Sequence, residues 1–86
     1  MSATESHPVR KRSVRLAGHR TSVSIEEPFW TELAAIARAR GLSLDRLIAE
    51  IDRERSGNLS SAIRLYVLAT LKARAEAVSA GDGEQM

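Results

Sequence analysis

Alternation of polar and apolar residues over residues 20–25 predicts a single β-strand. Side chains of a strand point alternately to its two faces, so one face is apolar and the other polar. The apolar face holds Thr21, Val23 and Ile25, and the polar face holds Arg20, Ser22 and Ser24. No other segment alternates as strongly, and a lone strand leaves its backbone groups unpaired. We therefore expect the same segment of a second copy to pair with it, which predicts a homodimer.

Two amphipathic helices are expected after this strand. The first begins near Glu27 and Pro28, since proline and acidic residues are favoured in the first helical turn. Gly41 is typical of a helix end, and Ser43 can cap the second helix. The expected core residues from these three elements are Val23, Ile25, Phe29, Trp30, Leu33, Ile36, Leu44, Leu47, Ile48 and Ile51.

A third helix is predicted over residues 59–78, after a break at residues 56–58. Apolar residues cover nearly all sides of its first half, which favours burial from more than one direction. Such a helix either caps the core of a dimer or joins dimers into a higher oligomer, and the sequence does not choose between the two. Residues 79–86 are expected to form a disordered tail.

Positive charge is concentrated at the start of the chain. Residues 1–20 contain five lysine or arginine residues and one glutamate, whereas the remaining residues contain eight basic and ten acidic ones. Residues 1–18 therefore predict a flexible basic arm. Within it, residues 13–17 alternate weakly before Gly18, which is consistent either with an extension of the strand or with the arm.

Composition excludes several classes of protein. The chain of 86 residues has no cysteine, so disulfides and thiolate chemistry are excluded. His7 and His19 lack acidic companions at ligand spacing, and no nucleophile elbow, phosphate loop or dinucleotide motif occurs. We therefore expect no metal, no cofactor and no enzymatic activity. No segment has the roughly 20 apolar residues of a membrane span, and we expect a cytoplasmic protein that makes no membrane contact.

The order of basic arm, strand, helix, glycine-containing turn and helix resembles the ribbon-helix-helix family of transcription factors, which includes the Arc and methionine repressors. The matching segments are the strand at residues 20–25, the helix opening EPFW at 27–30, and the turn GLS at 41–43 that leads into residues 44–48. Residues 12–22 and 57–62 are also similar to a bacterial subgroup with an added C-terminal helix. The resemblance implies a mainly α fold over residues 19–78, in which two intertwined chains form a two-stranded antiparallel β-ribbon.

The family resemblance also implies a site. In such proteins the outward side chains of the ribbon enter the DNA major groove, which admits a two-stranded ribbon. The residues expected to contact bases are then Arg20, Ser22 and Ser24. The alternative is that Ser22 and Ser24 face water and contact no DNA. Phosphate contacts are expected from the arm, from His19 and from the start of the second helix, where Ser43 alternatively acts as an ordinary cap. These phosphate-contacting residues are Arg10, Lys11, Arg12, Arg15, His19, Leu42, Ser43 and Leu44.

The resemblance therefore implies sequence-selective binding to double-stranded DNA and, most simply, transcriptional repression. A different class competes, because antitoxin members of the family bind a protein partner through a C-terminal segment. Helix three would have to supply such a binding face here, and a large exposed apolar patch on it would favour the interaction module.

Overall fold

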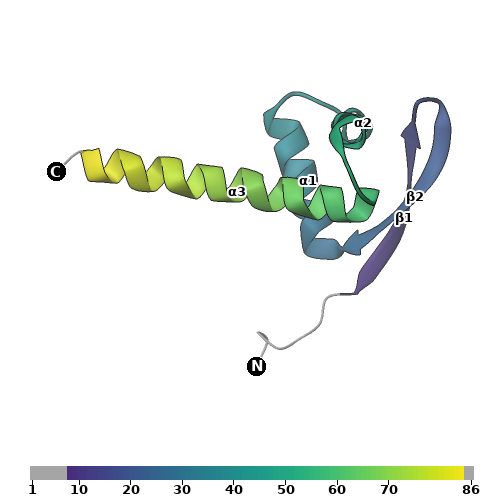
Figure 1. Cartoon of the computed structure of the whole chain (residues 1–86), viewed down its shortest axis with the longest axis horizontal. Coiled ribbons are helices and arrows are strands. Elements are labelled where there is room, and N and C mark those ends of the chain that lie inside the picture. The colour runs from purple at the N-terminus through teal and green to yellow at the C-terminus, as the bar shows by residue number, and fades with distance from the viewer. Residues whose placement is uncertain (1–7, 85–86) are drawn as a thin grey trace.

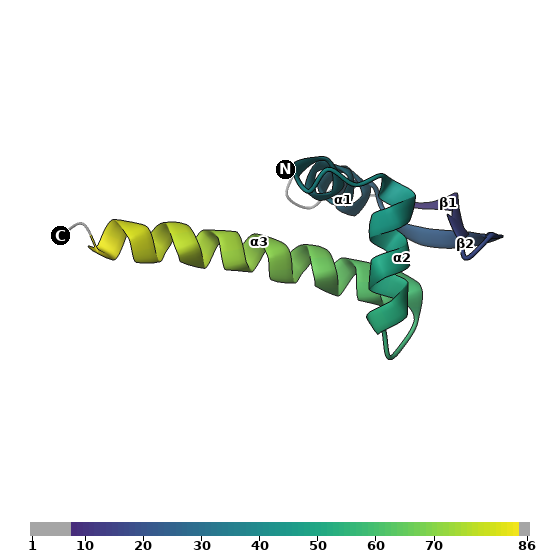
Figure 2. The same ribbon diagram turned by 90° about the horizontal axis from the view of Figure 1, so that it is seen from above.

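A two-stranded hairpin leads into three helices in the computed structural model, which describes residues 8–84. The strands are β1 (Val9–Leu16) and β2 (His19–Glu26), and the helices are α1 (Glu27–Ala39), α2 (Leu44–Glu54) and α3 (Leu59–Glu84). The hairpin, α1 and α2 gather around the first half of α3, whereas the second half of α3 extends away from them (Figures 1 and 2).

Within the chain, β2 pairs with β1, a partner that the sequence analysis did not predict, and pairing with a second copy stays a prediction. β1 and β2 pair antiparallel along their whole length, from Val9 opposite Glu26 to Leu16 opposite His19. Ala17 and Gly18 form the two-residue turn, with φ angles of 52° and 82°. Positive φ at both positions is the geometry of a type I′ turn, whose twist matches that of the flanking strands. One edge of β2 is therefore paired within the chain.

The expected arm over residues 1–18 is wrong for the part that forms β1, and residues 1–7 lie outside the described part of the chain. β1 is not recognisable as a strand from the sequence because two arginines occupy its inner face. Arg10 and Arg12 lie opposite Ile25 and Val23, on the side of the ribbon that covers the core. Their charges break the apolar alternation, so the segment resembles a solvated basic arm.

Gly41 and Ser43 mark the helix ends as predicted. α1 ends in a Schellman motif, in which Leu42 N–H donates to Ala37 O (2.9 Å) and Gly41 N–H donates to Arg38 O (3.1 Å). Gly41 has a φ of 70°, which suits glycine. At the start of α2, the hydroxyl of Ser43 accepts a hydrogen bond from Arg46 N–H (3.1 Å).

One hydrophobic core joins the inner face of the ribbon to the three helices. Eight of the ten expected core residues are buried, while Phe29 and Leu44 are partly buried against the same cluster. The structure adds Val14 from β1, Ala37 from α1, and Ile63 and Val67 from α3. These residues of the predicted core thus pack together within the chain, and sharing of the core with a second copy stays a prediction.

Helix α3 is longer than predicted, and within the single chain one side of its first half is exposed. Its first half was expected to be buried from several directions in a dimer or higher oligomer, which stays a prediction; within the single chain Leu65 is 65% exposed and Leu68 is 52% exposed. Only the side bearing Ile63 and Val67 packs on the core, because the hairpin, α1 and α2 all lie on that side. The helix also continues to Glu84, so the expected disordered tail is wrong for residues 79–84.

Candidate nucleic-acid interface

The outer face of the ribbon combines side chains from both strands. Residues directly opposite each other in an antiparallel pair point to the same side of the sheet. Of the four outward pairs, Val9 with Glu26 lies at the end of the ribbon next to α1, and the other three are Lys11 with Ser24, Ser13 with Ser22, and Arg15 with Arg20. Five of these six residues are exposed and Ser24 is half-buried. We call this set the outer ribbon face.

Arg20, Ser22 and Ser24, the residues expected to contact bases, thus share one face of the ribbon. Sequence reasoning missed Ser13 altogether and assigned Lys11 and Arg15 to a phosphate-binding arm. The structure places all three beside the β2 residues. The Ala-Gly turn at residues 17–18, together with the even spacing of the outward residues of β1, was the signal that could have located them.

The charge of the outer ribbon face is uncompensated. Arg15 and Arg20 lie directly opposite each other, and like charges in this position destabilise a strand pair. Neither of these arginines nor Lys11 forms an ion pair with any residue in the described range. The face therefore offers three cations and three hydroxyl groups to an external ligand.

Two of the expected phosphate-binding arginines lie on the opposite, inner face. Arg12 is 2.8 Å from the Glu27 carboxylate, and Arg10 is 3.5 Å from it. The Arg12 guanidinium also lies 5.2 Å from the centre of the Trp30 ring, within the range of a cation–π contact. These contacts explain how two charged residues are accommodated beside the core. They also distinguish Arg10 and Arg12 from the uncompensated cations of the outer ribbon face.

Helix α3 fixes the base of the ribbon. The hydroxyl of Ser60 accepts a long hydrogen bond from Ser24 N–H (3.4 Å), which covers part of the open edge of β2. Arg64 pairs with Glu26 (2.8 Å). The hydrogen bond from Arg64 lowers the pKa of the Glu26 carboxyl from its ordinary value. The carboxylate at the end of this face is thereby paired with a cation of α3.

The remaining expected phosphate contacts are separate from this face. His19 is exposed and lies next to the turn, opposite Leu16. Leu42, Ser43 and Leu44 form the start of α2, where the Ser43 hydroxyl is occupied as a cap. No contact in the structure distinguishes a phosphate site there from an ordinary capped helix.

The described part of the chain was also searched for metal sites and for membrane-spanning helices. Among the side chains that the structure describes, those of residues 8–78, no cluster of three or more metal-ligating groups occurs, and His7 falls outside that range. None of the three helices, as far as they are described, is long and apolar enough to cross a membrane.

Comparison with known proteins agrees with the ribbon architecture. A family model described as "Ribbon-helix-helix domain" matches residues 9–71. The chain belongs to the ribbon-helix-helix family. The match begins at the first residue of β1, so the domain includes the segment that was expected to be an arm. Domains of this family generally bind DNA, and they typically form dimers.

A solved structure is also similar to this ribbon-helix-helix chain. It is that of an uncharacterized protein from Bordetella pertussis Tohama I, with 33% sequence identity and a TM-score of 0.72. The similarity covers 84% of this chain and 62% of that one, so this chain spans less than two thirds of the length of its structural relative. A search of curated proteins gave no significant match.

Proposed function

We propose that this protein binds double-stranded DNA sequence-selectively, with the outer ribbon face in the major groove, and that it acts as a transcriptional repressor. The observation that carries the proposal is the facing pair Arg15 and Arg20, with Lys11 and three serines around it. Repulsion between the two facing arginines destabilises the fold unless an anion binds between them. The phosphate groups of DNA are closely spaced anions that could do so.

The ribbon suits the groove in shape and in chemistry. A two-stranded ribbon fits a major groove about 12 Å wide. In this orientation Arg20 and Arg15 are each able to donate two hydrogen bonds to one guanine. The serines are able to donate a hydrogen bond to a base or accept one from it. The proposed division of labour follows, with the arginines supplying selectivity and Lys11 supplying a phosphate contact.

The protein acts, in this proposal, as a homodimer in the bacterial cytoplasm and without catalysis. Family membership and the lack of a catalytic motif in the sequence support these points. A dimer would present two ribbons, and a DNA site for it would contain two repeated or palindromic halves.

The experiment is a selection from random-sequence duplexes at two salt concentrations, followed by binding measurements on the selected duplex. We expect a short repeated motif whose affinity falls steeply with salt. Arg20→Ala should weaken binding by roughly 5- to 150-fold, the equivalent of the 1–3 kcal/mol of one bidentate base contact. Arg74→Ala is the matched control, because Arg74 is an exposed cation on the part of α3 that extends away from the ribbon.

Equal losses in the two variants would mean that charge alone drives binding. No retention of DNA even at low salt would contradict the proposal and favour a second function, a protein-interaction module. That alternative has one specific observation behind it, the exposed apolar side chains of α3, which include Leu65, Leu68, Leu71 and Val78.

A further inference from the structure

One turn of helix α3 runs along the edge of β2 that β1 leaves open. The hydroxyl of Ser60 accepts the hydrogen bond from Ser24 N–H, and Arg64 lies 2.8 Å from the Glu26 carboxylate. Two residues span about 7 Å along a strand, and four residues span about 6 Å along a helix. Ser60 and Arg64 therefore match the spacing of Ser24 and Glu26, and this turn of α3 holds the last residues of β2.

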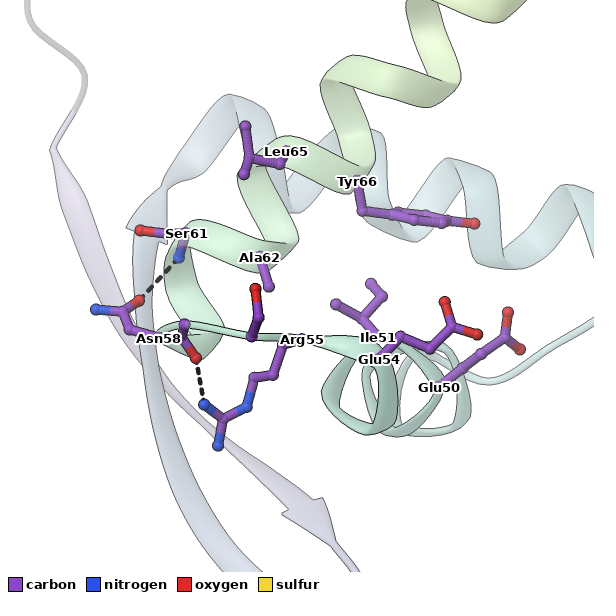
Figure 3. Close-up of a pocket in the computed structure, with 11 residues that line it drawn as sticks. Glu50, Ile51, Glu54, Arg55, Asn58, Ser61, Ala62, Leu65 and Tyr66 are labelled. Carbon is purple, nitrogen blue, oxygen red and sulfur yellow. Dashed lines mark hydrogen bonds between the residues drawn. The ribbon is translucent and has the colours of Figure 1, made fainter.

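The start of α3 is itself firmly anchored. The side-chain oxygen of Asn58 accepts a hydrogen bond from Ser61 N–H (2.9 Å), as Figure 3 shows. The backbone oxygen of Asn58 accepts a second one from Ala62 N–H (3.0 Å). On the inner side of the helix, Ile63 is fully buried in the core. Arg64 is thus placed beside the ribbon by a capped and packed helix.

Glu26 is the one acidic residue of the two strands, and it lies close to a cation of the outer ribbon face. Glu26 is opposite Val9, and Ser24 is opposite Lys11, so Lys11 and Glu26 are diagonal neighbours on one side of the ribbon. Diagonal neighbours are about 7–8 Å apart, within reach of a long side chain. Lys11 and Glu26 are therefore close enough to form an ion pair.

The structure shows a different pairing. The Glu26 carboxylate is bound by Arg64, and Lys11 forms no ion pair with any residue in the described range. The hydrogen bond from Arg64 lowers the pKa of the Glu26 carboxyl from 4.5. At neutral pH this carboxyl is ionised even at its ordinary pKa. Loss of Arg64 would therefore leave a negative charge beside Lys11, and not a neutral acid.

We infer that Arg64 is a positioning residue for DNA binding, which holds Glu26 and so keeps Lys11 free to contact a phosphate group. Without Arg64, the Glu26 carboxylate would pair with Lys11 and compete there with the phosphate groups of DNA. The inference rests on the proposed function. It gives α3 a part in the affinity of the ribbon for DNA, although the proposed contacts with DNA come from the strands.

The affinity for the selected duplex tests this role. Arg64→Ala should weaken binding by about two- to fivefold, the size of one screened surface charge interaction. The slope of log affinity against log salt should also become shallower by about one, because one phosphate contact is lost. Arg64→Lys keeps a cation beside Glu26 and should retain most of the affinity. Arg55→Ala is the matched control, because it releases the Asp52 carboxylate (2.6 Å) on α2 and should leave the affinity unchanged.

Two double variants distinguish positioning from a direct contact between Arg64 and DNA. Glu26→Gln in the Arg64→Ala background should restore the wild-type affinity, because the competing carboxylate is removed. In a Lys11→Ala background, Arg64→Ala should have little further effect on the salt dependence. A loss that Glu26→Gln does not restore would overturn the inference.

A measurement without DNA allows the inference and the proposed function to fail separately. The side-chain carboxyl signal of Glu26 would be followed by nuclear magnetic resonance as the pH is changed. In Arg64→Ala the pKa of Glu26 should stay below its ordinary value, because Lys11 takes the place of Arg64, and it should rise when Lys11 is replaced as well. A pKa that does not depend on Lys11 would overturn the inference even where DNA binds. Retention of no DNA by the wild type would overturn the proposed function, and with it the role of Arg64 in DNA binding, even where the titrations give the expected order.

Discussion

Replacing Val14 by aspartate tests whether β1 is part of the folded domain. Val14 is 5% exposed and packs in the core cluster, whereas Val9 on the same strand is 54% exposed. A basic arm would tolerate either substitution. The structure predicts that Val14→Asp destabilises the protein severely and that Val9→Asp has little effect.

The magnitude follows from burial. Removing the valine side chain forfeits most of the roughly 1.5–3 kcal/mol that full burial of such a side chain contributes. An aspartate at this position also loses its hydration without gaining a hydrogen bond or an ion pair in its place, which adds a cost on the order of a few kcal/mol. The expected loss of about 4 kcal/mol or more is a large part of the about 5–15 kcal/mol that stabilises a typical domain.

Urea unfolding followed by circular dichroism, at one fixed protein concentration, measures both variants. Val14→Asp should shift the midpoint strongly to lower urea or leave the chain unfolded in buffer. Val9→Asp should stay within about 0.5 kcal/mol of the wild type, as surface substitutions usually do. Two variants of equal stability would refute the assignment of β1 to the core.

Three further predictions concern the helices and their ion pairs. Gly41→Ala should lower the free energy of unfolding by about 1 kcal/mol. A Cβ at this position meets no atom within 4 Å, so the cost comes from holding alanine at a φ of 70°. An unchanged urea midpoint would contradict this prediction. Ser43→Ala should cost about 1 kcal/mol through loss of the α2 cap, measured in the same way, whereas Ser43→Asp should largely preserve stability. Arginine partners lower the pKa of Glu26 and Glu50 in the folded state, so the stability these carboxylates contribute is present above their ordinary pKa of 4.5 and is lost as the pH falls below it. Thermal unfolding between pH 6 and pH 3 should therefore be less pH-dependent in the Glu26→Gln and Glu50→Gln variants than in the wild type, and parallel curves would contradict the assigned ion pairs.

The local parts of the fold were predictable from sequence because their causes are local. Gly41, Ser43 and the apolar spacing of the first two helices act within a few residues, and the structure confirms the helix boundaries that they predicted. The β2 residues of the outer ribbon face followed from simple alternation.

The partner of β2 was not predictable in this way. Arg10 and Arg12 interrupt the apolar face of β1, and their compensation by Glu27 and Trp30 is visible only once α1 is folded against the ribbon. The environment of α3 likewise depends on which side of the helix the rest of the chain occupies. Its apolar composition predicted burial, but the single chain buries only one side.

A nuclear magnetic resonance titration with the selected duplex tests the central claim most directly. Amide signals of the uniformly labelled protein, those of the ribbon and of α3 alike, would be followed as DNA is added. The account predicts that the largest shifts fall on the outer ribbon face, at Lys11, Ser13, Arg15, Arg20 and Ser22. Shifts confined to α3, with the ribbon unaffected, would contradict it.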